Sequence, residues 1–222
     1  MKITLPTVAL GRSVLSNLEE GLSLEWVVAN GLGGYASSTA LGVNTRKYHG
    51  LLVSSFNPPV DRRVALSKAD EQVLVDGESY PLGSNEFSKG FHPQGYRHLA
   101  GFAQSPFPTY TYNVDGVEIH KRILLPYQKN AVVIIYEAAI PVKKHVILQI
   151  SPLVNSRHFH SVTDKNKLAL TFVQRVSEQR TMVQIAEPQL TLILSSSSGR
   201  YVQGEKWVEE EVIPKLKENP NS

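Results

Sequence analysis

Short runs of β-branched and aromatic residues, separated by Gly, Pro, Asn and Asp, make up most of the chain. Such runs favour extended backbone, because branched and aromatic side chains pack well on a pleated surface. Their spacing of about 10–15 residues is typical of a large antiparallel β-sandwich. We therefore predict an all-β fold. The strands predicted in this way cover Leu24–Val28, Tyr48–Phe56, Val132–Ala138, Val146–Ser151, Leu168–Gln174, Thr181–Ile185 and Leu190–Ser195.

Two Asp-Gly pairs between β-prone runs predict tight hairpins, one over residues 72–80 and one over residues 109–120. Both central residues of a type I′ turn need a positive φ, which Asp and Gly tolerate. In the second hairpin, alternation places Tyr110 and Tyr112 on one face of their strand. Glu118 and His120 share a face on the partner strand.

Two segments depart from the strand pattern. Gly83 to Gly101 is rich in Gly, His, Phe and Tyr and is predicted to be a long irregular loop. Residues 206–217 have the composition of a helix that Pro214 kinks or splits. The sequence therefore divides into a β-sandwich domain over 1–203 and a C-terminal helical tail over 204–222.

Composition narrows the function further. The 222 residues suit one domain, and the absence of cysteine excludes a disulfide scaffold, a thiolate metal site and a cysteine nucleophile. The net charge of +3 is spread along the chain, and no Lys/Arg run exceeds two residues, which disfavours nucleic-acid binding. No apolar run approaches the roughly 20 residues of a membrane-spanning helix, and the N-terminus lacks a signal-peptide pattern. We expect a soluble cytoplasmic protein.

The segment Glu25–Leu52 is the most distinctive part of the sequence. Gly31, Gly33 and Gly34 match neither of the common glycine-rich phosphate-binding patterns, so we assign them to a tight turn or a close backbone approach. Thr45, Arg46, Tyr48 and His49 then gather polar and aromatic groups ahead of an apolar strand. They fit either a buried polar network at a strand end or a surface that contacts sugar through an aromatic face and hydroxyl-binding groups.

Other candidate chemistry is weaker. His158 and His160 have same-face spacing, but no third ligand follows in a recognisable metal-binding spacing, so we predict no metal and no cofactor. No G-x-S-x-G nucleophile motif occurs. Several carboxylates could act in acid–base chemistry, but the sequence does not pair them in space. These carboxylates are Glu25, Asp70, Glu71, Glu86 and Glu118.

One long ordered motif resembles a known family. It runs Glu25-Trp26-Val27-Val28-x-Asn30-Gly31-x-Gly33-Gly34-Tyr35-x-Ser37 and continues as Thr45-Arg46-Lys47-Tyr48-His49-Gly50-Leu51-Leu52. Supporting stretches are Arg63-Val64-x-Leu66-Ser67-Lys68-x-Asp70-Glu71 and Pro152-Leu153-Val154-Asn155-x-Arg157-x-x-His160. Together they resemble the amino-terminal domain of archaeal and bacterial glycogen debranching enzymes of the amylo-α-1,6-glucosidase type.

The resemblance implies a β-supersandwich similar to galactose mutarotase. In the family this domain binds and orients the glucan, and an (α/α)6 barrel carries the carboxylates of the glycoside hydrolase. The barrel would lie beyond Ser222, so the chain is expected to be the sandwich alone, without catalytic residues of its own. Two departures from the family pattern stand out: His158 follows Arg157 where the family tends to have Asp, and residues 205–222 do not resemble the usual link to the barrel.

Three hypotheses follow. The leading one is a non-catalytic domain that binds glycogen or a branched maltodextrin. The second is a stand-alone mutarotase-like or epimerase-like sugar enzyme, and the third is an interaction domain for a separately encoded barrel chain. For the second, the candidate acids are His49, His92, His98 and His160, with Glu71 or Glu118 as base. The carbohydrate-binding residues that the resemblance implies are Trp26, Asn30, Tyr35, Arg46, Tyr48 and His49, followed by Arg157 and His160.

Overall fold

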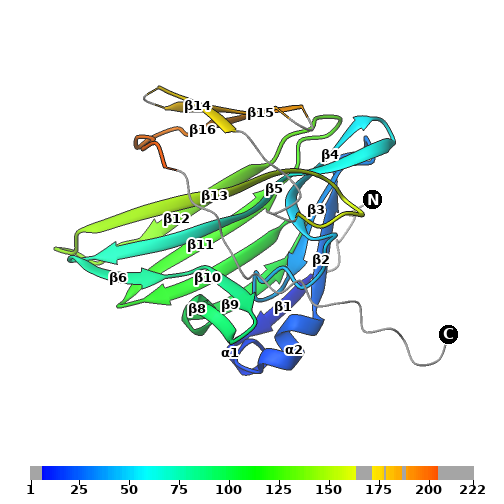
Figure 1. Ribbon diagram of the computed structural model, residues 1–222. Helices are drawn as coiled ribbons and strands as arrows, with labels where there is room; N and C mark the ends of the chain where they lie inside the picture. The colour runs from blue at the N-terminus through cyan, green and yellow to red at the C-terminus, as the bar shows by residue number, and fades with distance from the viewer. Residues whose placement is uncertain (1–6, 164–171, 178, 187–188, 205–222) are drawn as a thin grey trace, which may run out of the picture.

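The computed structural model describes residues 7–163, 172–177, 179–186 and 189–204. Within these residues the protein is built mainly from two antiparallel sheets that face each other (Figure 1). The prediction of an all-β sandwich is therefore confirmed. Two short helices, α1 (Arg12–Leu15) and α2 (Leu18–Ser23), were not predicted. The Asn17 side chain accepts a hydrogen bond from the Glu20 N–H and so caps α2.

The two main sheets have a simple strand order. The first consists of β1 (Val8–Gly11), β9 (Leu99–Gln104), β10 (Pro108–Val114), β11 (Val117–Leu124) and β12 (Val133–Ala139). Within the described residues, the second has six strands, of which five follow in the order β13 (Val146–His158), β5 (Val60–Val75), β4 (Gly50–Asn57), β3 (Tyr35–Thr39) and β2 (Glu25–Ala29). Strand β5 pairs with β4 through its first half and with β6 (Glu78–Pro81) through its last four residues, while β13 follows its other edge.

Two smaller sheets complete the described structure. One consists of β14 (Phe172–Ser177), β15 (Arg180–Ile185) and β16 (Leu190–Ser195), and the other of β7 (Ser84–Phe87) and β8 (Gly90–Gln94). The expected strand Leu168–Gln174 lies mostly outside the described residues. The expected C-terminal helix lies wholly outside them.

Both predicted hairpins are confirmed. Asp76 and Gly77 have φ values of 52° and 95°, and Asp115 and Gly116 have φ values of 47° and 77°. Thr111 pairs with His120, so the side chains of Glu118 and His120 lie on the outer face of their sheet, while Tyr110 is buried on the inner face.

The prediction of an irregular loop over Gly83–Gly101 is wrong. This stretch contains β7, β8, the 3-10 helix η1 (Gly95–His98) and the start of β9. The buried anchors of β7 are polar: Lys68 Nζ donates to the Ser84 carbonyl and, at 2.7 Å, to Asn85 Oδ1. A strand held in this way has no apolar alternation, so its sequence resembles that of a loop.

Polar side chains join the two main sheets across the core. Trp26 of β2 donates its indole N–H to the hydroxyl of Tyr110 on β10 at 2.6 Å, and that hydroxyl donates to the Thr39 carbonyl at 2.7 Å. Lys121 of β11, in the first sheet, forms a 2.6 Å ion pair with Glu71 of β5, in the second. The interior is therefore held together by specific hydrogen bonds as well as by apolar packing.

The chain passes from the first sheet to the second through residues 140–145, which fasten both hairpin turns. Lys144 Nζ donates to the carbonyl and the carboxylate of Asp115 in the β10–β11 turn. The backbone of His145 exchanges hydrogen bonds with Asp76 in the turn before β6, at 2.9 Å in each direction. One crossing segment thus contacts the tips of two hairpins that belong to opposite sheets.

Candidate functional site

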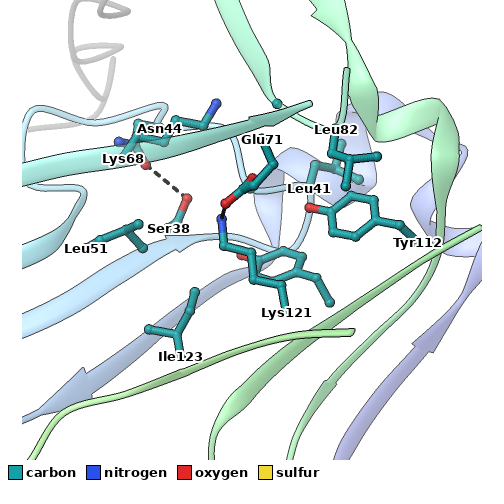
Figure 2. Close-up of a pocket in the computed structure, with 13 residues that line it drawn as sticks. Ser38, Leu41, Asn44, Leu51, Lys68, Glu71, Leu82, Tyr112, Lys121 and Ile123 are labelled. Carbon is teal, nitrogen blue, oxygen red and sulfur yellow. Dashed lines mark hydrogen bonds and ion pairs between the residues drawn. The ribbon is translucent and has the colours of Figure 1, made fainter. Parts of the chain in front are cut away.

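A polar cavity of about 20 Å³ lies between the two main sheets. Figure 2 shows Lys121 and Glu71 meeting across it, with Tyr112, Leu82 and Ile123 around them. A cavity of this size holds about one water molecule. A glucose ring does not fit, so this cavity is not a sugar-binding site.

A second hollow, of about 280 Å³, lies on the β14–β16 sheet. The described residues that line it carry amide, hydroxyl and apolar groups, with no aromatic ring and no charge among them. They are Val173, Gln184, Ile185, Ala186, Gln189, Leu190 and Thr191. Sugar sites use flat aromatic faces, so this hollow is a poor candidate.

Two of the site residues predicted from the sequence, Trp26 and Asn30, are buried and stabilise the fold. Trp26 is 3% exposed and lies against Tyr110 in the core. Asn30 is fully buried: its Oδ1 accepts the N–H groups of Leu32 and Gly34, and its Nδ2 donates to the Lys129 carbonyl at 2.9 Å. Neither side chain reaches the surface, so neither belongs to an exposed sugar-binding surface.

The glycines after Asn30 serve backbone geometry, as the sequence predicts. Gly31 and Gly33 have φ values of 79° and 90°. A Cβ on Gly33 would lie 2.6 Å from the Pro59 carbonyl oxygen, and one on Gly31 would lie 2.5 Å from the Tyr127 ring. At Gly33 the close neighbour is backbone, which leaves no room for a side chain, and both glycines bring residues 30–34 against distant loops.

Glu25, Arg46 and His49 form a charged group beside the β3–β4 connection. The Glu25 carboxylate lies 2.5 Å from Arg46 Nε and 3.7 Å from His49 Nε2. The Thr45 N–H donates to His49 Nδ1, so the neutral imidazole carries its proton on the nitrogen that faces Glu25. Burial lowers the pKa of His49, and the Glu25 charge partly offsets this. His49 is 3% exposed, whereas the Arg46 side chain is 53% exposed.

Tyr48 lies in a turn before β4 and meets a second turn that follows β13. Its hydroxyl is 3.1 Å from His160 Nδ1, and its ring centre is 5.5 Å from that of His160 and 5.7 Å from that of Phe159. His158 continues the group, with its ring centre 5.2 Å from that of Phe159. We call Tyr48, His158, Phe159 and His160 the Tyr48 cluster. It joins residues 112 positions apart in sequence.

Arg157 and Tyr35 stabilise the two turns of this cluster through hydrogen bonds to their carbonyl groups. The strand pairing of β13 is irregular between Val154 and Arg157, where Asn155 Oδ1 accepts two backbone N–H groups. The buried Arg157 guanidinium then donates to the carbonyls of Ser161, at 2.8 Å, and of Lys47. The Tyr35 hydroxyl donates to the Tyr48 carbonyl at 2.8 Å. Burial raises the pKa of Tyr35, so this hydroxyl stays protonated as a donor.

Sequence reasoning missed three members of this surface. Phe159 occupies an unspecified position of the quoted motif, and the cations Lys47 and Arg62 lie above rings: Lys47 Nζ is 5.2 Å from the Tyr48 ring centre, and the Arg62 guanidinium carbon is 5.4 Å from that of Phe159. An aromatic residue between two histidines was the available signal. Tyr48 was predicted to begin a strand but lies in a turn, in which Arg46 contacts Glu25 and Tyr48 contacts His160.

The acid–base pairs considered for a stand-alone enzyme do not meet. Glu71 contacts Lys121 and the Tyr136 hydroxyl, and Glu118 contacts His120, so neither is bonded to a candidate histidine in the described structure. Across the described ranges, no three His, Cys, Asp or Glu side chains gather as a metal-binding group. In the part of the chain that the structure describes, no helix has the length and apolarity required to cross a membrane.

Comparison with known proteins agrees with the motif. Neither the curated proteins nor the solved structures gave a match to this chain. The family model described as "Glycogen debranching enzyme N terminal" matches residues 24–215, which include both turns of the Tyr48 cluster and the Glu25–Arg46–His49 group. Because this match covers most of the 222 residues, the chain belongs to the glycogen debranching enzyme N-terminal domain family.

Proposed function

We propose that this chain binds an α-glucan, such as glycogen or a branched maltodextrin, and orients it for a debranching enzyme. The catalytic carboxylates would come from an (α/α)6 barrel, as part of the same protein or as a partner chain. Family membership supports the class of ligand. The absence of cysteine agrees with a cytoplasmic protein, which the proposal includes.

The observation that carries the proposal is the packing of Tyr48 against His160 and Phe159 at the surface. A glucose unit presents C–H groups on its ring face and hydroxyls around its rim. The Tyr48 cluster supplies aromatic faces, and Arg46, on the same β3–β4 connection as Tyr48, would supply a donor and its partner Glu25 an acceptor. Tyr35 and Arg157 hold the two turns in place before a ligand arrives, which lowers the entropic cost of binding.

Isothermal titration with maltooligosaccharides tests the proposal. We expect weak binding to the isolated chain, and Tyr48→Ala should weaken it about three- to tenfold, the effect of one lost aromatic contact. Tyr48→Phe keeps the ring and should retain most of the affinity. Tyr127→Ala is the matched control, because Tyr127 is 75% exposed and has no described contact with the cluster. Equal affinity for Tyr48→Ala and the unchanged chain would contradict the proposal.

A further inference from the structure

Among the described residues, the positive charges around the Tyr48 cluster have no carboxylate partner. Lys47 and Arg62 both lie over its rings. Among the ion pairs of the described residues, no carboxylate contacts either cation, nor His158 or His160. The carboxylate of Asp61, next in sequence to Arg62, pairs with Arg63, and that of Glu25 pairs with Arg46.

Hydrogen-bonding capacity is also unbalanced. The backbone N–H of His160 donates to His158 Nδ1. In a neutral imidazole the proton then lies on Nε2, so this ring nitrogen of His158 is a donor. Arg62 donates its Nε–H to the Gly33 carbonyl at 2.7 Å, and its two terminal nitrogens have no described acceptor. Lys47 Nζ has none either. A neutral sugar hydroxyl both donates and accepts, so a surplus of donors favours a ligand with additional acceptor oxygens.

Arg62 is held in one orientation. Its Nε bond to Gly33 and the Phe159 ring beneath its guanidinium restrict the side chain, and the Phe159 N–H donates to the Arg62 carbonyl at 3.1 Å. A guanidinium plane fixed in this way presents a fork of N–H groups that matches phosphate oxygens. A phosphate monoester carries a charge of about −1.5 to −2 near neutral pH, which balances the two charges of Lys47 and Arg62.

We propose that the Tyr48 cluster, together with Lys47 and Arg62, binds a phosphate monoester carried on a glucose unit. The sugar ring stacks on Tyr48, and the phosphate accepts hydrogen bonds from Arg62, Lys47 and His158. This inference rests on the proposed function for the glucan, and it adds phosphorylated glucose units to the ligands of the site.

Isothermal titration with four ligands tests it: a neutral maltooligosaccharide, the same oligosaccharide with a phosphate monoester, glucose 6-phosphate and inorganic phosphate. We expect the phosphorylated oligosaccharide to bind at least about tenfold more tightly than the neutral one at low salt, as for a charge-assisted bidentate contact. The difference should shrink at high salt, because the cations are partly exposed.

Lys47→Gln should reduce the difference in affinity between the phosphorylated and the neutral oligosaccharide at least about threefold. Arg62→Lys, which keeps the charge but loses the fork, should also reduce it. Lys89→Gln, an exposed lysine between β7 and β8, is the control and should leave it unchanged.

The outcomes separate this inference from the proposed function. Equal affinity for the neutral and phosphorylated oligosaccharides overturns the inference and leaves glucan binding intact. Equal affinity for inorganic phosphate and glucose 6-phosphate also overturns it, because the sugar then contributes nothing. Glucose 6-phosphate that binds as tightly as the phosphorylated oligosaccharide supports the phosphate site and identifies a free sugar phosphate as its ligand. Failure of all four ligands to bind overturns both proposals.

Discussion

Lys121 and Glu71 form an ion pair in the interior of the sandwich, where both side chains are less than a tenth exposed. The Tyr136 hydroxyl donates a hydrogen bond to Glu71 Oε1 at 2.5 Å. Burial, followed by the charge of Glu71, raises the pKa of Tyr136, so its hydroxyl remains a donor at physiological pH. Such a group is stable only while every member is present, because an unpaired buried charge is costly.

Lys121→Met should therefore destabilise the protein by about 3–5 kcal/mol, since it leaves the Glu71 carboxylate buried without its counter-charge. Urea unfolding followed by fluorescence measures this loss. The double variant Lys121→Met/Glu71→Leu should recover most of it, because the uncompensated charge is gone. A double variant as unstable as the single one would show that shape, and not charge, limits this part of the core.

His49 gives the stability a pH dependence of known sign. Its pKa is lowered from 6.5 by burial, so the folded protein binds fewer protons at this site than the unfolded chain does. The contribution of neutral His49 is complete above pH 6.5 and is lost as the pH falls toward the folded-state pKa. We expect the urea midpoint to fall as the pH is lowered below 6.5.

His49→Gln is the test of that assignment. The variant should show a smaller fall in the urea midpoint over the same pH range. Burial, with the charge of Arg12 as a second cause, also lowers the pKa of His98, so some pH dependence of the same sign should remain. An unchanged slope in the variant would assign the effect to other groups.

At the scale of elements, the 30–34 turn places three segments together. Gly33 approaches Pro59 before β5, and its carbonyl accepts the Arg62 Nε–H, while Asn30 reaches Lys129 after β11. The turn therefore connects Arg62, which lies over a ring of the Tyr48 cluster, to the loop that follows β11. Its glycines are required by contacts that are distant in sequence as well as by their own backbone conformation.

Two glycine variants separate these causes. Gly33 and Gly77 have similar φ values of 90° and 95°, but only Gly33 has a neighbour within reach of a Cβ. Gly77→Ala should cost about 1–2 kcal/mol, the strain of a left-handed alanine. Gly33→Ala should cost clearly more, because its Cβ would lie 2.6 Å from the Pro59 carbonyl oxygen. Equal losses in thermal unfolding would show that the loop moves away without cost.

The sequence predicted correctly those elements that are specified by residues close together in the chain. The Asp-Gly turns specify their hairpins without help from the rest of the chain. Strand β5 was predicted only over its last residues, because its first part carries buried Lys68 and Glu71, whose partners Ser84 and Lys121 come from other elements. The family motif located the Tyr48 turn, but its buried Trp26 and Asn30 could not be told from surface residues without the fold. Phe159 joins the site through a contact across distant sequence, which no local pattern contains.

At the scale of the whole molecule, the small β14–β16 sheet shares the core of the sandwich. Val183, Ile185, Leu190 and Leu192 are buried and belong to the same apolar cluster as Trp26. Their strands alternate buried and exposed positions, so one face of this sheet packs on the rest of the protein. We expect all described sheets to unfold together.

Leu190→Ala tests this cooperativity. The loss of a buried leucine side chain should lower the global stability by about 2–4 kcal/mol. Trp26 lies in the main sandwich, so its fluorescence in a Trp207→Phe background reports unfolding there and not in the small sheet. A shifted Trp26 transition would show one cooperative unit. An unshifted one, with an earlier change in circular dichroism, would show that the small sheet unfolds alone.

The crossing segment at residues 140–145 has a practical consequence for engineering. Its bonds to Asp115 and Asp76 mean that an inserted peptide or new chain ends placed there would separate two hairpin tips at once. The β7–β8 turn is the better position for a fluorescent label or a circular permutation. Ser88 and Lys89 are exposed there, and Gly90 has open space around it. A dye or new chain ends at that turn would leave the closure of the sandwich intact.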